Sequence, residues 1–103
     1  MNIWASMILM DGSDPAIDRI VRETASERLT IVFVPTPEAA PDVARALIAE
    51  GVELIELCGG FGVEPGAAVV KAVAGRAAVG LVSFGIDSLT QAAAYKAKFE
   101  AGG

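Results

Sequence analysis

The stretch VELIELCGGFGVEPGAAVVKAVAG, residues 52–75, has the pattern of one strand, one tight loop and one helix. Residues 52–57 are mostly apolar and of strand length, and three glycines lie within the next five residues. Glu64-Pro65 is typical of a helix start, because the amide that proline lacks would be unpaired there anyway. Valines at 69, 70 and 73 recur at helical spacing, and Gly75 is a typical helix end. The stretch therefore predicts one βα unit.

Three more strand-length apolar runs lie elsewhere in the chain, at Ile3–Met10, Leu29–Val34 and Ala77–Ser83. Between the runs, helical spacing and start signals predict helices over Ile17–Thr24, from Pro37 or Pro41 to Gly51, and from Asp87 or Ser88 to Glu100. We therefore expect residues 1–103 to form a single α/β domain of four βα units.

Strand–helix–strand crossovers are right-handed in nearly all proteins, so four βα units predict a mostly parallel, four-stranded sheet. The expected strand order is flavodoxin-like, 2-1-3-4, with helices on both faces. A half-barrel with all helices on one side is the first alternative. A ferredoxin-like arrangement is the second, and it would need two strands joined without a helix.

Composition excludes several functions. The net charge is −5 and the eight lysines and arginines are scattered, so nucleic acids and anionic membranes are not expected partners. No apolar run approaches the roughly 20 residues of a membrane span, and the first residues do not resemble a signal peptide. A single cysteine is typical of a reducing, cytoplasmic setting. The absence of histidine excludes Ser-His-Asp and Cys-His catalysis within one chain.

The apolar fraction is 53%, which is high for a small soluble chain. A sheet covered on both faces accounts for part of this excess. The rest predicts an interface with another copy of the chain, so we expect a homo-oligomer, at least a dimer.

Ligands of open parallel sheets bind at the carboxyl ends of the strands, an edge that we call the rim. The four loops expected on the rim contain residues 11–14, 35–37, 58–62 and 84–87. The glycine-rich loop could bring backbone amides close to a ligand, or it could simply be a tight turn. It matches neither the P-loop nor the dinucleotide fingerprint. The candidate ligand-binding residues are Asp11, Thr36, Gly59, Gly60, Phe61 and Ser83.

Glu56 lies within an apolar strand that should be central, where a carboxylate must be paired, hydrogen-bonded or protonated. It is either a structural partner of Arg76 or Arg19, or a catalytic acid or base near the rim. Cys58, placed before a helix start, is the second catalytic candidate or else a small buried apolar residue. No metal or organic cofactor is expected. The alternative is a Mg²⁺ or Mn²⁺ site formed by Asp11, Asp14 and Glu56.

ELCGGFG at residues 56–62 and VGLVSFG at residues 79–85, with EGVELI at residues 50–55, resemble a family of bacterial proteins of about this length. That family is described as a domain of unknown function. The resemblance covers the chain from its first predicted strand to its last and implies that the two glycine-containing loops characterise the family. It implies no activity, cofactor or catalytic residue.

Three functions are compatible with these observations. The first is a homo-oligomeric binding or assembly module with a small polar pocket on the rim, contacted by the amides of Gly59, Gly60 and Phe61. The second is a small lyase or isomerase that uses Glu56, either alone or with a divalent cation held by Asp11 or Asp14. The third is a purely structural subunit whose surplus apolar surface forms an interface.

Overall fold

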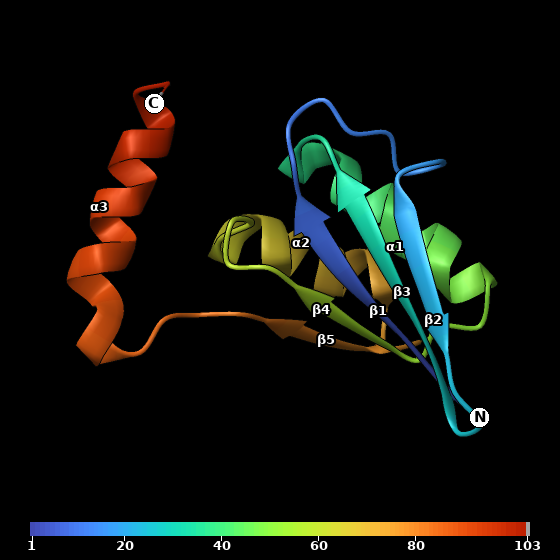
Figure 1. The fold of residues 1–103 in the computed structure, drawn as a ribbon. Coiled ribbons are helices and arrows are strands. Elements are labelled where there is room, and N and C mark those ends of the chain that lie inside the picture. The colour runs from blue at the N-terminus through green and yellow to red at the C-terminus, as the bar shows by residue number, and fades with distance from the viewer. Residues whose placement is uncertain (103) are drawn as a thin grey trace.

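The computed structural model, which describes residues 1–102, contains one five-stranded sheet, two helices against it and a third helix that stands apart (Figure 1). The strands are β1 (Asn2–Leu9), β2 (Arg19–Glu23), β3 (Glu27–Val34), β4 (Leu54–Leu57) and β5 (Ala78–Leu81). The helices are α1 (Ala40–Ala49), α2 (Val63–Val73) and α3 (Leu89–Glu100). Short 3₁₀ turns, η1 (Pro37–Ala39) and η2 (Ile86–Ser88), precede α1 and α3.

The predicted helix over Ile17–Thr24 is wrong, because most of this segment is strand β2, which forms an antiparallel hairpin with β3. Isoleucine and valine in its centre favour an extended backbone. The Thr24 hydroxyl accepts hydrogen bonds from the amides of Ser26 and Glu27, at 3.3 and 3.2 Å, and so closes the hairpin turn. The expected cap residue Asp14 does accept the amide of Ala16, at 3.0 Å, but no helix follows it.

The sheet is mixed, and its order is β2-β3-β1-β4-β5. Strand β2 is antiparallel to β3, whereas β3, β1, β4 and β5 pair in parallel. The prediction of a four-stranded, mostly parallel, flavodoxin-like sheet is therefore wrong. The half-barrel alternative is wrong as well, since all of its strands would be parallel. Two strands joined without a helix, which the sequence did not suggest, do occur as β2 and β3.

The prediction of helices on both faces is also wrong. The connections from β3 to β4 and from β4 to β5 both advance in the same direction along the sheet. Right-handed crossovers that advance in one direction place their helices on the same face. Helices α1 and α2 accordingly lie together behind the sheet in Figure 1. Only the connection from β1 to β3 runs the other way, and it contains β2 instead of a helix.

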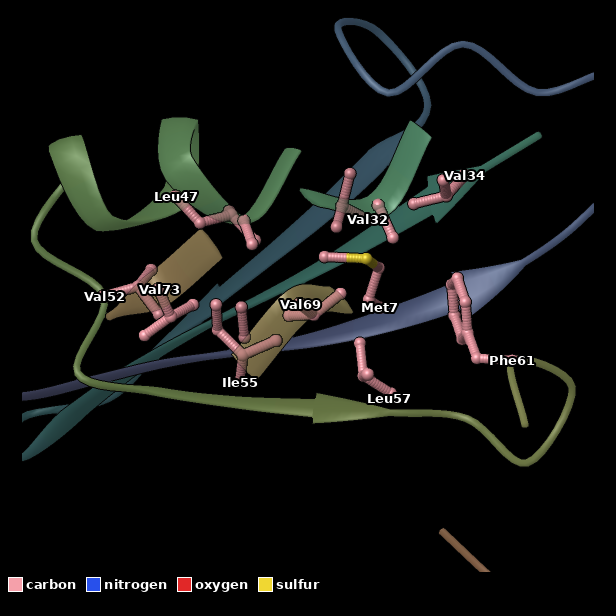
Figure 2. Close-up of a cluster of buried hydrophobic side chains, with 13 residues drawn as sticks. Met7, Val32, Val34, Leu47, Val52, Ile55, Leu57, Phe61, Val69 and Val73 are labelled. Carbon is pink, nitrogen blue, oxygen red and sulfur yellow. The ribbon is translucent and has the colours of Figure 1, made fainter. Parts of the chain in front are cut away.

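The core lies between the sheet and these two helices, and Figure 2 shows its side chains pointing toward one another. Met7 pairs in register with both Val32 and Leu57, so these three side chains share one face of the sheet. Phe61, in the loop after β4, closes one end of this cluster (Figure 2). The remaining fully buried large side chains are Val34, Leu47, Ile55, Val69 and Val73.

The opposite side of the sheet, which we call the open face, is covered by no helix of residues 1–102. Strand alternation places there Trp4, Ser6 and Ile8 of β1, Leu29, Ile31 and Phe33 of β3, Leu54 and Glu56 of β4, Ile20 and Arg22 of β2, and Ala78 and Gly80 of β5. None of these residues is buried, whereas the residues of β1, β3 and β4 that point to the helices include Ala5, Met7, Val32, Val34, Ile55 and Leu57, which are fully covered. Within residues 1–102, no helix has both the length and the apolar character that a membrane crossing requires.

Helix α3 follows the expected span closely, but it does not pack on the sheet. Its residues are exposed except for Ala92, which is half-buried. Its large apolar residues Leu89 and Phe99 are 51% and 67% exposed. The reason lies in the topology, because α3 follows the edge strand β5 and none of the described residues after β5 forms a further strand.

Candidate functional site

A cavity of about 950 Å³ lies on the rim, where the parallel strands β1, β3 and β4 end. We call it the rim cavity. Its walls come from the three loops that follow these strands and from one side of α3. Its lining residues are Leu9, Met10, Asp11, Pro35, Thr36, Pro37, Glu38, Cys58, Gly60, Tyr95 and Phe99.

The loop after β4 is held to the end of β1 through Cys58. The Cys58 amide donates to the carbonyl of Met7 at 3.1 Å, which extends the parallel pairing by one step. The Cys58 sulfur in turn accepts the amide of Leu9 at 3.3 Å. The amide of Phe61 donates to the carbonyl of Cys58 at 3.2 Å, so the loop turns back at once and inserts the phenyl ring into the core. Gly60 is left exposed at the cavity wall.

The two glycines of this loop have different neighbours. A methyl group at Gly60 would lie 3.4 Å from a Leu9 methyl and 3.6 Å from the Cys58 sulfur, which are ordinary contacts. A methyl group at Gly59 would lie 3.0 Å from the ring of Phe84, which is too close without a shift of that ring. The absence of a side chain at Gly59 therefore leaves room for the segment after β5. Gly59 does not line the rim cavity.

Two carboxylates, Asp11 and Glu38, give the rim cavity its charge. Both side chains are exposed. No lysine or arginine lines the cavity in the part of the chain that the structure describes. Thr36 has an extended backbone, and its hydroxyl makes no capping hydrogen bond to η1, so this oxygen can face a ligand. The cavity thus combines negative charge and hydrogen-bonding groups with an apolar lining.

The six ligand-binding candidates and the catalytic candidate Cys58 make seven predicted residues on the loops, and four of them come together in this cavity: Asp11, Thr36, Cys58 and Gly60. Phe61 does not, since it is 3% exposed and belongs to the core. Ser83 is exposed in the segment after β5 and does not line the cavity. The hypothesis that the amide of Phe61 contacts a ligand therefore loses its geometric basis, because this amide is bonded to Cys58.

Glu56 lies outside the rim cavity. The expectation that its strand is buried on both faces is wrong, because β4 alternates between exposed and buried residues. Neither expected partner pairs with it, since Arg19 forms an ion pair with Glu50 at 3.0 Å and Arg76 donates to the carbonyls of Val73 and Ala72. Glu56 instead borders a shallow cavity of about 440 Å³ on the open face, beside Trp4 and Leu54.

The metal alternative finds no ligand set. In residues 1–102, no three side chains among histidine, cysteine, aspartate and glutamate gather closely enough to hold a cation. Asp14 is engaged locally, because its carboxylate accepts the amide of Ala16 while its own amide donates to Asp18 at 2.7 Å. Asp11 lies at the rim and Glu56 on the open face.

Sequence reasoning missed Glu38 and the two aromatic residues of the cavity. Glu38 follows Thr36-Pro37 directly, so the acidic first turn of the next helix was the available signal. Tyr95 and Phe99 are four residues apart and therefore share one side of α3. Their part in the cavity could not be anticipated, because it depends on where α3 stands.

Comparison with known protein families shows that residues 2–97 match the model of a family of unknown function, DUF6506. The match confirms the prediction, made from the sequence motifs, that the chain resembles an uncharacterised family of proteins of about this length. No curated protein and no solved structure matches the chain.

Proposed function

We propose that this chain, which belongs to the family of unknown function DUF6506, binds a small polar molecule in its rim cavity. One observation carries the proposal. The loops after three parallel strands bring Asp11, Thr36, Cys58 and Gly60 to one concave surface. Small-molecule sites in open α/β sheets lie at this edge, and they combine an apolar lining with a few convergent polar groups.

The chemistry of the lining favours an amine over an anion. Asp11 and Glu38 would repel a phosphate or carboxylate, and the glycine loop brings no basic side chain to offset them. The same two carboxylates would attract an ammonium group. Tyr95 and Phe99 add aromatic rings, which stabilise a cation by about 0.5–1 kcal/mol at exposed sites. The ligand class that fits is therefore a small cationic amine with an apolar part.

A panel of small molecules tests the proposal by thermal unfolding and calorimetry. Alkylamines should raise the midpoint of unfolding, whereas carboxylates and phosphates of the same size should not. The double variant Asp11→Asn, Glu38→Gln should weaken amine binding at least tenfold. Glu64→Gln is the matched control, because Glu64 also lies in the first turn of a helix but outside the cavity.

Two outcomes would reject this function. The first is that no amine stabilises the protein at millimolar concentration. The second is stabilisation that the double variant retains in full, since binding would then occur elsewhere.

The enzymatic alternative has weaker support. Its two proposed catalytic residues do not share a cavity, because Cys58 faces the rim cavity and Glu56 borders the cavity on the open face. A cytoplasmic location fits the binding role, since a lone cysteine at the rim stays reduced there.

A further inference from the structure

The open face is an apolar surface without a cover. Trp4, Ile8, Leu29, Ile31 and Phe33 form adjacent rows on β1 and β3, and all remain partly exposed. Leu54 and Ile20 extend the surface on either side and are 36% and 49% exposed. Contiguous apolar surfaces of this kind mark interaction sites in soluble proteins.

The segment Val82–Glu100, which we call the arm, is a second apolar surface without a cover. Its large apolar side chains are between 48% and 84% exposed: Val82, Phe84, Ile86, Leu89, Tyr95 and Phe99. Isolated helices of about 12 residues are marginal in water, and helices in proteins owe most of their stability to packing. Helix α3 has 12 residues and stands apart from the sheet (Figure 1). It therefore needs a surface on which to pack.

The arm is directed away from its own open face. The Val82 amide donates to the carbonyl of Leu57 at 2.9 Å and so continues the direction of β5 past the rim. Phe84 then packs beside Gly59. A side chain at position 59 would collide with the Phe84 ring. Gly85 is extended, with φ −71° and ψ 165°. These contacts carry α3 past the rim, where Tyr95 and Phe99 border the rim cavity but no part of α3 reaches its own open face.

We propose that the arm of one copy packs on the open face of a second copy, and that the second copy returns the same contact. The two surfaces are the same in both copies, so a twofold axis closes the pair. This inference does not rest on the proposed ligand. The surfaces that each chain leaves uncovered are thereby covered by its partner.

The area suits a stable dimer. At roughly 100 Å² of exposed apolar area for each of the six large arm side chains, two arms and an equal area on the two faces that they cover would bury about 2,400 Å². Specific interfaces of standard size bury roughly 1,200–2,000 Å² in total.

Charge complementarity supports the same partner. Two of the three lysines in the chain, Lys96 and Lys98, lie on α3. On the open face, Glu27 already accepts the indole N–H of Trp4 at 2.7 Å. Glu56 forms no ion pair within residues 1–102. A lysine of the second copy's arm would pair with Glu56, which has no ion-pair partner among the described residues of its own chain and lies beside the apolar residues Trp4 and Leu54.

Light scattering after gel filtration, together with mixing of two variants, tests the exchange. The 10.6-kDa chain should run as a dimer at micromolar concentration. The arm variant Leu89→Ser, Phe99→Ser and the face variant Ile31→Arg should each weaken dimerisation at least tenfold. Val70→Ser, at a residue that is 54% exposed outside both surfaces, should not. An equimolar mixture of the two variants should form heterodimers, because one intact arm still meets one intact face.

A monomeric wild-type chain, or a dimer that neither variant weakens, would overturn the proposal. So would a mixture of the variants that remains monomeric, since an arm that folds back on its own chain gives no such rescue. A cross-link provides a check that does not depend on weakening the fold. In a Cys58→Ser background, Leu89→Cys on one tagged chain and Ile31→Cys on an untagged chain should form a disulfide between the two chains. With both cysteines in one chain, a bond formed within single chains would refute the exchange.

Discussion

Replacing Gly66 by alanine should stabilise this protein, although Gly66 is buried. Gly66 lies inside α2, where glycine costs roughly 0.5–1 kcal/mol relative to alanine because it loses more backbone freedom on folding. A methyl group at this position would lie 3.4 Å from one methyl carbon of Leu81 and 3.9 Å from Leu57. These are ordinary van der Waals distances, so the added group fills space without a collision.

The expected gain for Gly66→Ala is therefore about 0.5–1 kcal/mol in the free energy of unfolding. For a domain of this size, such a gain raises the melting temperature by roughly 2–8 °C. Urea titration followed by circular dichroism measures it, and the slope m should not change. Ala67→Gly, at the exposed neighbouring position of the same helix, is the matched control and should cost a similar amount. A Gly66→Ala protein that is less stable than wild type would refute the reasoning, because α2 would then have to pack more tightly on β5 than described.

Two further substitutions test the loop after β4. Phe61→Ala should lower the free energy of unfolding by about 3 kcal/mol or more, because Phe61 is 3% exposed and closes the core. Equilibrium denaturation measures this change. A loss below about 1 kcal/mol would contradict a core role for Phe61. Gly59→Ala should lower stability by about 1 kcal/mol through displacement of the Phe84 ring. In a double-mutant cycle, Phe84→Ala should abolish most of that cost, and additive effects would exclude the contact.

The four parallel strands of the sheet were predictable from the sequence, because a strand that is buried on one or both faces needs a run of apolar residues. All four predicted runs overlap strands, namely β1, β3, β4 and β5. The β2 hairpin was not predictable from its own residues. Ile17, Ile20 and Val21 fit a helical period, while Arg19–Glu23 also suits an extended edge strand. Pairing with the exposed edge of β3 decides between the two, and that contact is tertiary.

The misplaced β2 accounts for the wrong expectation that Glu56 is buried. A helix over Ile17–Thr24 would have covered the second face of the sheet and buried Glu56. With a strand there instead, the face stays open and Glu56 is exposed on it. The rim residues Asp11, Thr36, Cys58 and Gly60 were predictable because they depend only on where parallel strands end. The wall formed by Tyr95 and Phe99 depends on the direction of the arm, which no local pattern encodes.

Trp4 is the only tryptophan of the chain, and its indole ring stands on the open face with its N–H bonded to Glu27. The wavelength of its emission maximum therefore depends on solvent exposure at that face and at no other place in the molecule. The tryptophan fluorescence of an unlabelled sample therefore reports whether the open face is exposed to solvent. It can be followed during dilution, heating or mixing.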